Sequence, residues 1–193
     1  MNRTVILILF LIIAKIGLAQ KGKDTIVYKL PVINGKLTYT DSITVQGHNK
    51  AVLDSAAKKW INNYFKYHWA DTLSKDKDAR SSVLSWALLE FRAPPNSIRA
   101  VYYDYYLLVT IKITCNNDYY TYEIFDEYFR PKSGFFNKVV IHPTSADWLI
   151  DIYKKKDYGL MHNLDGSTIR YYLSCVNTAI INCIASLNKA MKN

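Results

Sequence analysis

The apolar residues between positions 36 and 45 alternate with polar ones, a pattern that predicts a half-buried β-strand. The Asn34–Gly35 pair in front of it is a turn signal, and residues 26–32 indicate a shorter strand that ends near Pro31. The predicted buried side of the longer strand consists of Leu37, Tyr39, Ile43 and Val45.

From residue 50 to residue 66 the apolar residues recur every three or four positions, which predicts an amphipathic helix with Asn49 as its N-cap. Trp60 lies on the apolar side of this helix and is expected in the core. Residues 82–91 are apolar at both odd and even positions, as is typical of an inner strand. This strand is expected to end at residues 93–96, because the two prolines there cannot donate to a ladder.

Two long strands are predicted between residues 101 and 130, on either side of Asn116 and Asn117. A two-residue turn at these asparagines would pair Cys115 with Asp118. It would also separate an apolar face from a polar one, as a one-sided antiparallel hairpin requires. The predicted apolar face carries Leu107, Val109, Ile111, Ile113, Tyr120, Tyr122 and Ile124, and the polar face carries Thr110, Lys112, Thr114, Thr121 and Glu123.

The last quarter of the chain is expected to be helical, after a strand or an ordered loop at residues 135–141. A short helix is predicted from about Thr144, with Asp147 three residues later, to about Tyr153. The longest helix follows, with Asp165, Ser167 or Thr168 as its cap. We expect it to lie across the apolar face of the sheet through Ile169, Leu173, Val176, Ile180, Cys183, Ile184, Leu187 and Met191.

These elements predict an α+β fold, in which an antiparallel sheet of about five strands, in β-α-β-β-β order, is packed on one face by helices. The length fits one domain over residues 20–193. The sheet and the first helix occupy about residues 26–141 of this predicted domain, and the C-terminal helices occupy about residues 144–191.

Residues 1–19 have the pattern of a cleavable export signal: a basic start, an apolar run, and small residues before Gln20. Lys15 interrupts the apolar run, so the alternative, a retained membrane anchor, would have to bury or snorkel this lysine. Cleavage would leave 23 basic and 16 acidic residues, a net charge of +7. Export argues against nucleic acid as the partner of this basic chain.

Three segments resemble a family of exported bacterial proteins of unknown function, described as having a TATA-binding-protein-like fold. They are the strand from Gly35 to Gly47 with its tryptophan-containing helix, the hairpin at residues 109–122, and the helical ending at residues 186–191. The chain departs from the family at Asn116–Asn117, where Asp-Gly is common, and at the insertion-like residues 93–96. The resemblance implies a β-α-β-β-β sheet gripped by helices and carries over no activity and no functional residue.

The sequence contains no recognised catalytic or metal-binding motif, so we expect no catalytic, cofactor-binding or metal-binding residues and no cofactor. Cys175 and Cys183 would stand about 12 Å apart on the last helix, too far to bridge, which leaves Cys115 as the one residue that either could pair with. Free thiols are the main expectation. The histidines share no ligand spacing; they are His48, His68, His142 and His162.

Glu123, Asp126 and Glu127 form an acidic cluster, but adjacent strand positions point to opposite faces, so Asp126 and Glu127 are not expected to serve one site. The run from Lys154 to Lys156 is expected to be solvated surface.

Tyrosine is the one compositional excess. Half of the 16 tyrosines lie in the predicted hairpin: Tyr102, Tyr103, Tyr105, Tyr106, Tyr119, Tyr120, Tyr122 and Tyr128. They indicate either cross-strand packing or a surface for a partner.

We therefore expect an exported, periplasmic or extracellular protein of a Gram-negative cell envelope, with no stable membrane span after cleavage. It is expected to be a non-catalytic binding or interaction module whose ligand is a protein, peptide or glycan. The alternative is an envelope hydrolase whose site residues converge only in the fold. The sequence does not define an oligomeric state.

Overall fold

The computed structural model describes residues 27, 29–70, 83–93, 103–131, 145–156 and 165–193. The chain divides into two compact units, Met1–Leu30 and Pro31–Asn193. In the first unit, the predicted signal peptide lies outside the described residues, and Val27 and Lys29 have helical backbone. The predicted strand at residues 26–32 is therefore wrong, and extended structure begins only at Val32.

The second unit begins with a two-stranded hairpin. β1 (Val32–Ile33) pairs with β2 (Lys36–Leu37) across the predicted turn, where Asn34 and Gly35 have φ values of 52° and 80°. Both residue types tolerate this left-handed backbone, which two-residue hairpin turns require. The hairpin stays short because the chain bends after Leu37, where the Thr38 N–H donates to the Pro31 carbonyl at 2.8 Å.

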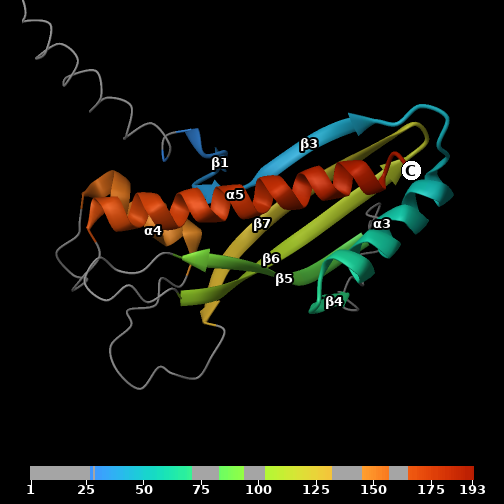
Figure 1. Cartoon of the computed structure of the whole chain (residues 1–193). Coiled ribbons are helices and arrows are strands. Elements are labelled where there is room, and N and C mark those ends of the chain that lie inside the picture. The colour runs from blue at the N-terminus through green and yellow to red at the C-terminus, as the bar shows by residue number, and fades with distance from the viewer. Residues whose placement is uncertain (1–26, 28, 71–82, 94–102, 132–144, 157–164) are drawn as a thin grey trace, which may run out of the picture. The chain divides into compact units, whose positions relative to one another are not determined.

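The main sheet has five antiparallel strands in the order β3-β7-β6-β5-β4 (Figure 1). The strands are β3 (Tyr39–Thr44), β4 (His68–Ala70), β5 (Val83–Ala93), β6 (Tyr103–Asn116) and β7 (Tyr119–Pro131). The predicted α+β class with about five strands is confirmed. β4 was not predicted, because three residues are too few to show an alternating pattern.

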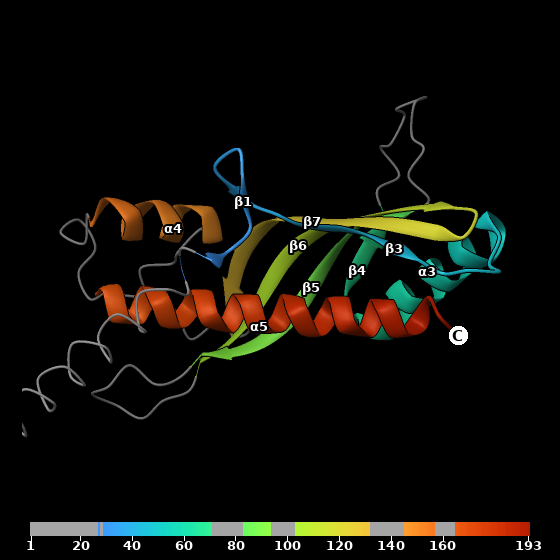
Figure 2. The ribbon, with the colours of Figure 1, turned by 90° about the horizontal axis from the view of Figure 1, so that it is seen from above.

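Three described helices accompany the sheet: α3 (Lys50–Tyr64), α4 (Ala146–Lys155) and α5 (Gly166–Ala190). α5 runs along one side of the sheet in both views (Figures 1 and 2). All eight residues of its predicted apolar stripe are buried, which confirms the docking expected from the sequence. None of the described helices is long and apolar enough to cross a membrane.

Partly buried hydrogen bonds fix the position of α5 against the other elements. Each joins a polar side chain of α5 to an aromatic side chain of the sheet or of α3, which lets a large apolar ring enter the core without leaving its polar atom unpaired. The bonds run from Tyr39 Oη to Asn177 Oδ1 (2.9 Å), from Tyr120 Oη to Asn188 Oδ1 (2.5 Å) and from Trp60 Nε1 to Ser186 Oγ (3.1 Å).

The turn of the β6–β7 hairpin lies one residue later than predicted. Cys115 pairs with Tyr120 rather than with Asp118, so the predicted register is wrong by two residues. A shift of two keeps every side chain on its predicted face. The predicted apolar face is accordingly buried along its whole length, and on the predicted polar face only Thr110 is buried.

Contacts with the segment between β3 and α3 explain where this turn lies. Asp118 takes the left-handed backbone, with a φ of 65°. Its N–H donates to the His48 carbonyl, and its Oδ1 accepts the Gly47 N–H, both at 2.8 Å. Aspartate tolerates positive φ nearly as well as asparagine, and at this position Asp118 makes both contacts.

The helix caps follow the sequence with one displacement. Asn49 caps α3 and Asp165 caps α5, as predicted. α4 begins one residue later than predicted, because Ser145 accepts the capping hydrogen bond from Trp148 N–H. The predicted strand or loop at residues 135–141 lies outside the described residues.

Candidate functional site

The sheet face away from α3 and α5 carries an apolar strip across its three central strands. Strand alternation directs these side chains away from the helices. Cross-strand pairing then places them in two adjacent rows, Trp86–Thr110–Phe125 and Leu88–Leu108–Tyr128. We define the outer strip as Trp86, Leu88, Tyr106, Leu108, Phe125 and Tyr128.

The two ends of the outer strip are its most exposed parts. Trp86 on β5 keeps 43% of its surface exposed and Tyr128 on β7 keeps 47%, and the other members are half-buried. Tyr67, which is 41% exposed, meets Tyr106 edge-to-face at 6.0 Å between ring centroids. The aromatic surface therefore continues from Tyr128 on β7 to Tyr67, the residue directly before β4.

Charged residues lie at the border of the outer strip and not within it. In the next row, Lys112 Nζ on β6 lies 3.6 Å from Glu123 Oε2 on β7, and both side chains are well exposed. On the other side, Glu90 follows Leu88 by two residues on the same face of β5 and is exposed. The centre of the strip contains one polar side chain, Thr110, which is only 7% exposed.

A β-bulge in β7 reverses which face of the sheet its odd-numbered and even-numbered side chains point to. The register of β6 and β7 shifts so that Asp126 and Glu127 together stand opposite Val109. Asp126 takes the left-handed backbone, with a φ of 56°, as the first residue of such a bulge often does. The extra residue turns Glu127 toward the core, where it is only 1% exposed.

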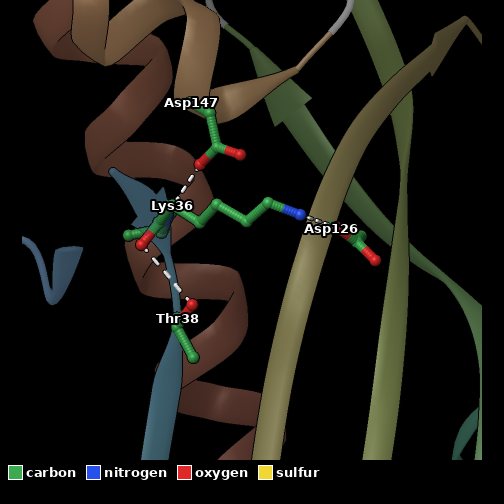
Figure 3. A network of polar contacts seen from close by, with 5 residues as sticks. Lys36, Thr38, Asp126 and Asp147 are labelled. Carbon is green, nitrogen blue, oxygen red and sulfur yellow. Dashed lines mark hydrogen bonds and ion pairs between the residues drawn. The ribbon is translucent and has the colours of Figure 1, made fainter. Parts of the chain in front are cut away.

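Glu127 lies where three elements meet. The hairpin strand β2 approaches β7 through Lys36, whose Nζ lies 3.3 Å from Asp126 Oδ1. α4 approaches β2 through Asp147, whose Oδ1 accepts the Leu37 N–H at 2.6 Å (Figure 3). Ser145, at the start of α4, forms a bridge with Tyr128 of β7. We call this meeting point, formed by residues 31–38, 126–128 and 145–147, the junction.

The pKa of the Glu127 carboxyl is raised to about 8, chiefly by burial and in addition by the negative charges of Asp147 and Asp126. Its own backbone N–H and the Lys36 ammonium act in the opposite direction and offset only part of this increase in the pKa. Neither carboxyl oxygen has a hydrogen-bond partner in the described part of the chain. At neutral pH the folded protein therefore holds Glu127 mainly as the neutral acid.

The structure separates the three carboxylates of the acidic cluster. Glu123 pairs with Lys112 on the outer face, Asp126 pairs with Lys36, and Glu127 is buried. Sequence reasoning placed Asp126 and Glu127 by simple alternation and missed the bulge. The signal was present in the switch of apolar residues from even positions, up to Ile124, to the odd position of Phe129.

The other candidate groups do not gather at one place. His48 lies before α3 and His68 in β4, and His142 and His162 lie outside the described residues. Among the residues that the structure describes, no group of three histidines, cysteines or carboxylates could hold a metal ion. None of the three cysteines forms a disulfide, so the pairing of Cys115 that the sequence left open is absent.

Burial also raises the pKa of the Cys183 thiol to about 12, which makes this residue a poor nucleophile at neutral pH.

Some tyrosines of the hairpin pack in the core, and others lie on the surface. Tyr105, Tyr120 and Tyr122 face the helices and are buried. Tyr106 and Tyr128 belong to the outer strip, and Tyr119 is exposed beside the turn. The described part of the lysine run, at the end of α4, is exposed as expected.

No family model matches the chain, and no curated protein shows significant similarity to it. Two solved structures do. One is a TBP-like protein from Parabacteroides distasonis ATCC 8503, with 17% identity, a TM-score of 0.58, and coverage of 85% of this chain and 97% of that chain. This chain has a TBP-like fold.

The other is a DUF4468 family protein from Bacteroides ovatus ATCC 8483, with 12% identity, the same TM-score, and coverage of 85% of this chain and 91% of that chain. The TBP-like fold and the bacterial neighbours agree with the resemblance noted in the sequence. At these identities the comparison establishes the fold and leaves the function to be argued from the surface.

Proposed function

We propose that this chain is an exported, non-catalytic binding module of the cell envelope, and that a protein partner docks on the outer strip. The observation that carries this proposal is the contiguous apolar surface around Trp86 and Tyr128, two of the most exposed large side chains in the described residues. Exposed apolar patches of this kind, bordered by polar residues, are typical of interaction sites.

The composition of the strip favours a protein over a glycan. Protein interfaces have a core rich in Trp, Tyr and Phe, depleted in charge, and surrounded by a polar rim. The outer strip has this arrangement, with the Lys112–Glu123 pair at its border. Glycan sites rely on several hydrogen-bonding side chains beside the aromatic rings, and apart from the tyrosine hydroxyls and the Trp86 indole the centre of the strip offers only the buried Thr110.

The hydrolase alternative receives less support. Glu127 is the one carboxyl with a strongly raised pKa among the described residues, which is a property of general acids. However, its side chain is 1% exposed, so a substrate cannot reach it in this conformation. A general acid must come within hydrogen-bonding distance of the reacting atom.

The proposal is tested by capturing the partner and measuring its affinity. A photo-reactive amino acid in place of Trp86, in the native cell, should form a covalent adduct with a defined envelope protein. The purified partner should bind the Trp86→Ala/Tyr128→Ala variant at least about tenfold more weakly than the wild type, because truncated aromatic anchors at interface centres cost that much or more.

The matched control is Tyr171→Ala/Ile181→Ala, which removes two side chains of similar exposure, 44% and 49%, from α5. Its affinity should stay within about twofold of the wild type, since α5 lies on the other side of the sheet. Equal weakening by both double variants, or photo-adducts to glycan alone, would refute the proposed protein-binding surface.

A further inference from the structure

Glu127 is a buried carboxyl for which the described chain provides no hydrogen bond. An ionised carboxylate in such a place is costly, because it has lost its hydration without gaining a partner. The neutral acid is far less costly. The closed arrangement around Glu127 therefore depends on its keeping a proton.

The charges that face Glu127 do not compensate its ionisation. Asp126 on β7 and Asp147 on α4 are both negative, and β6 contributes only the apolar Val109 opposite the bulge. The positive group is Lys36 on β2, but its ammonium is paired with Asp126 and lies at the surface. Among the described residues, Tyr39 on β3 is a further titratable neighbour, and its own pKa is raised, first by burial and then by Glu127.

The junction is held together by few contacts. β1 and β2 contain two residues each. β2 is tied to α4 by the Leu37–Asp147 hydrogen bond and to β7 by the exposed Lys36–Asp126 pair. In the described residues, α4 is tied to β7 by the backbone bridge between Ser145 and Tyr128, and the buried Leu37 and Ala146 add apolar packing. Segments with few backbone bonds open at less than the global unfolding free energy.

We propose that Glu127 makes the junction a proton-controlled contact: with Glu127 protonated, the β1–β2 hairpin and α4 close against β7, and with Glu127 ionised, they separate from it. Separation hydrates the carboxylate and moves it away from Asp147. The main sheet and α5 stay folded, because their contacts do not pass through Glu127. This inference does not rest on the docking surface proposed above, although Tyr128 belongs to both the outer strip and the junction.

Hydrogen exchange of the Leu37 amide tests the proposal, since this N–H donates to Asp147 only in the closed junction. Protection factors, corrected for the intrinsic pH dependence of exchange, are measured at pH 6 and pH 9. Protection of Leu37 in the wild type should fall at least about tenfold, as linkage to a carboxyl with a pKa of about 8 requires. In Glu127→Gln, which imitates the neutral acid, it should change less than about twofold.

The Ile180 amide in α5 is the internal control and should keep its protection at both pH values. A wild-type Leu37 amide with constant protection, an equal loss in Glu127→Gln, or a parallel loss at Ile180 would each overturn the proposal. The titration of the Glu127 carboxyl by carbon NMR in the wild type gives a second reading that needs no variant. A midpoint near 4.5 would overturn the proposal, and a midpoint between about 7 and 9 supports it.

Discussion

Tyr119 and Tyr120 are neighbours in β7 with opposite surroundings. Tyr119 is 41% exposed, whereas Tyr120 is completely buried and donates its hydroxyl hydrogen to Asn188 of α5. Burial raises the pKa of the Tyr120 hydroxyl, so this group remains a donor throughout the neutral range. The buried hydroxyl therefore contributes to the position of α5 through a hydrogen bond as well as through packing.

Tyr120→Phe should lower the free energy of unfolding by about 1–2 kcal/mol, because it leaves the partly buried Asn188 oxygen without its donor. Tyr119→Phe removes the same atom from an exposed side chain and should change stability by less than about 0.5 kcal/mol. Urea unfolding of the two variants measures both values. Equal effects would show that the Tyr120–Asn188 bond contributes nothing specific.

At the same scale, the sequence identified Glu127 as part of an acidic cluster but did not place it in the core. Strict alternation treats every strand residue as one step of a period of two, and the extra residue at Asp126 breaks that period. Bulges depend on how two strands align, so one strand alone indicates them only weakly. The raised pKa of Glu127 could not be expected without knowing that the bulge turns it inward.

Among the elements, α5 shows how much an apolar stripe can establish. Its eight stripe residues were identified by helical spacing and all of them are buried. The β6–β7 hairpin shows the limit. Its faces were predicted correctly, but its register was wrong by two residues, because the turn is held by Gly47 and His48 from a distant segment. Periodicity determines which face is buried, and contacts from elsewhere select between registers of equal parity.

The docking of α5 can be tested with two adjacent isoleucines. Ile180 is fully buried against the sheet, and Ile181 is 49% exposed on the other side of the same helix. Ile180→Asp should lower the free energy of unfolding by several kcal/mol, because it buries an unpaired charge. Ile181→Asp should cost less than about 1 kcal/mol. Thermal unfolding of both variants checks this difference, and similar melting temperatures would contradict the docking.

At the scale of the whole molecule, the outer strip is the feature that sequence reasoning could not assemble. Its residues come from three strands, and only the strand order and registers bring Trp86, Leu108 and Tyr128 side by side. The tyrosine excess indicated either cross-strand packing or a surface for a partner. It did not indicate which tyrosines would face outward or that Trp86 would lie beside them.

The most direct test of the binding account is the accessibility of position 112, at the border of the outer strip, in the native cell envelope. Lys112→Cys and Ile181→Cys are compared in a Cys175→Ser background, since Cys115 and Cys183 are buried. The reagent is a membrane-impermeant maleimide, which labels a thiol only outside the inner membrane. Both purified variants should react at similar rates.

In cells, the account predicts that position 181 is labelled, as an exported protein requires, while position 112 is protected severalfold by the docked partner. Equal labelling of both positions in cells would contradict docking on the outer strip. No labelling at either position would contradict export.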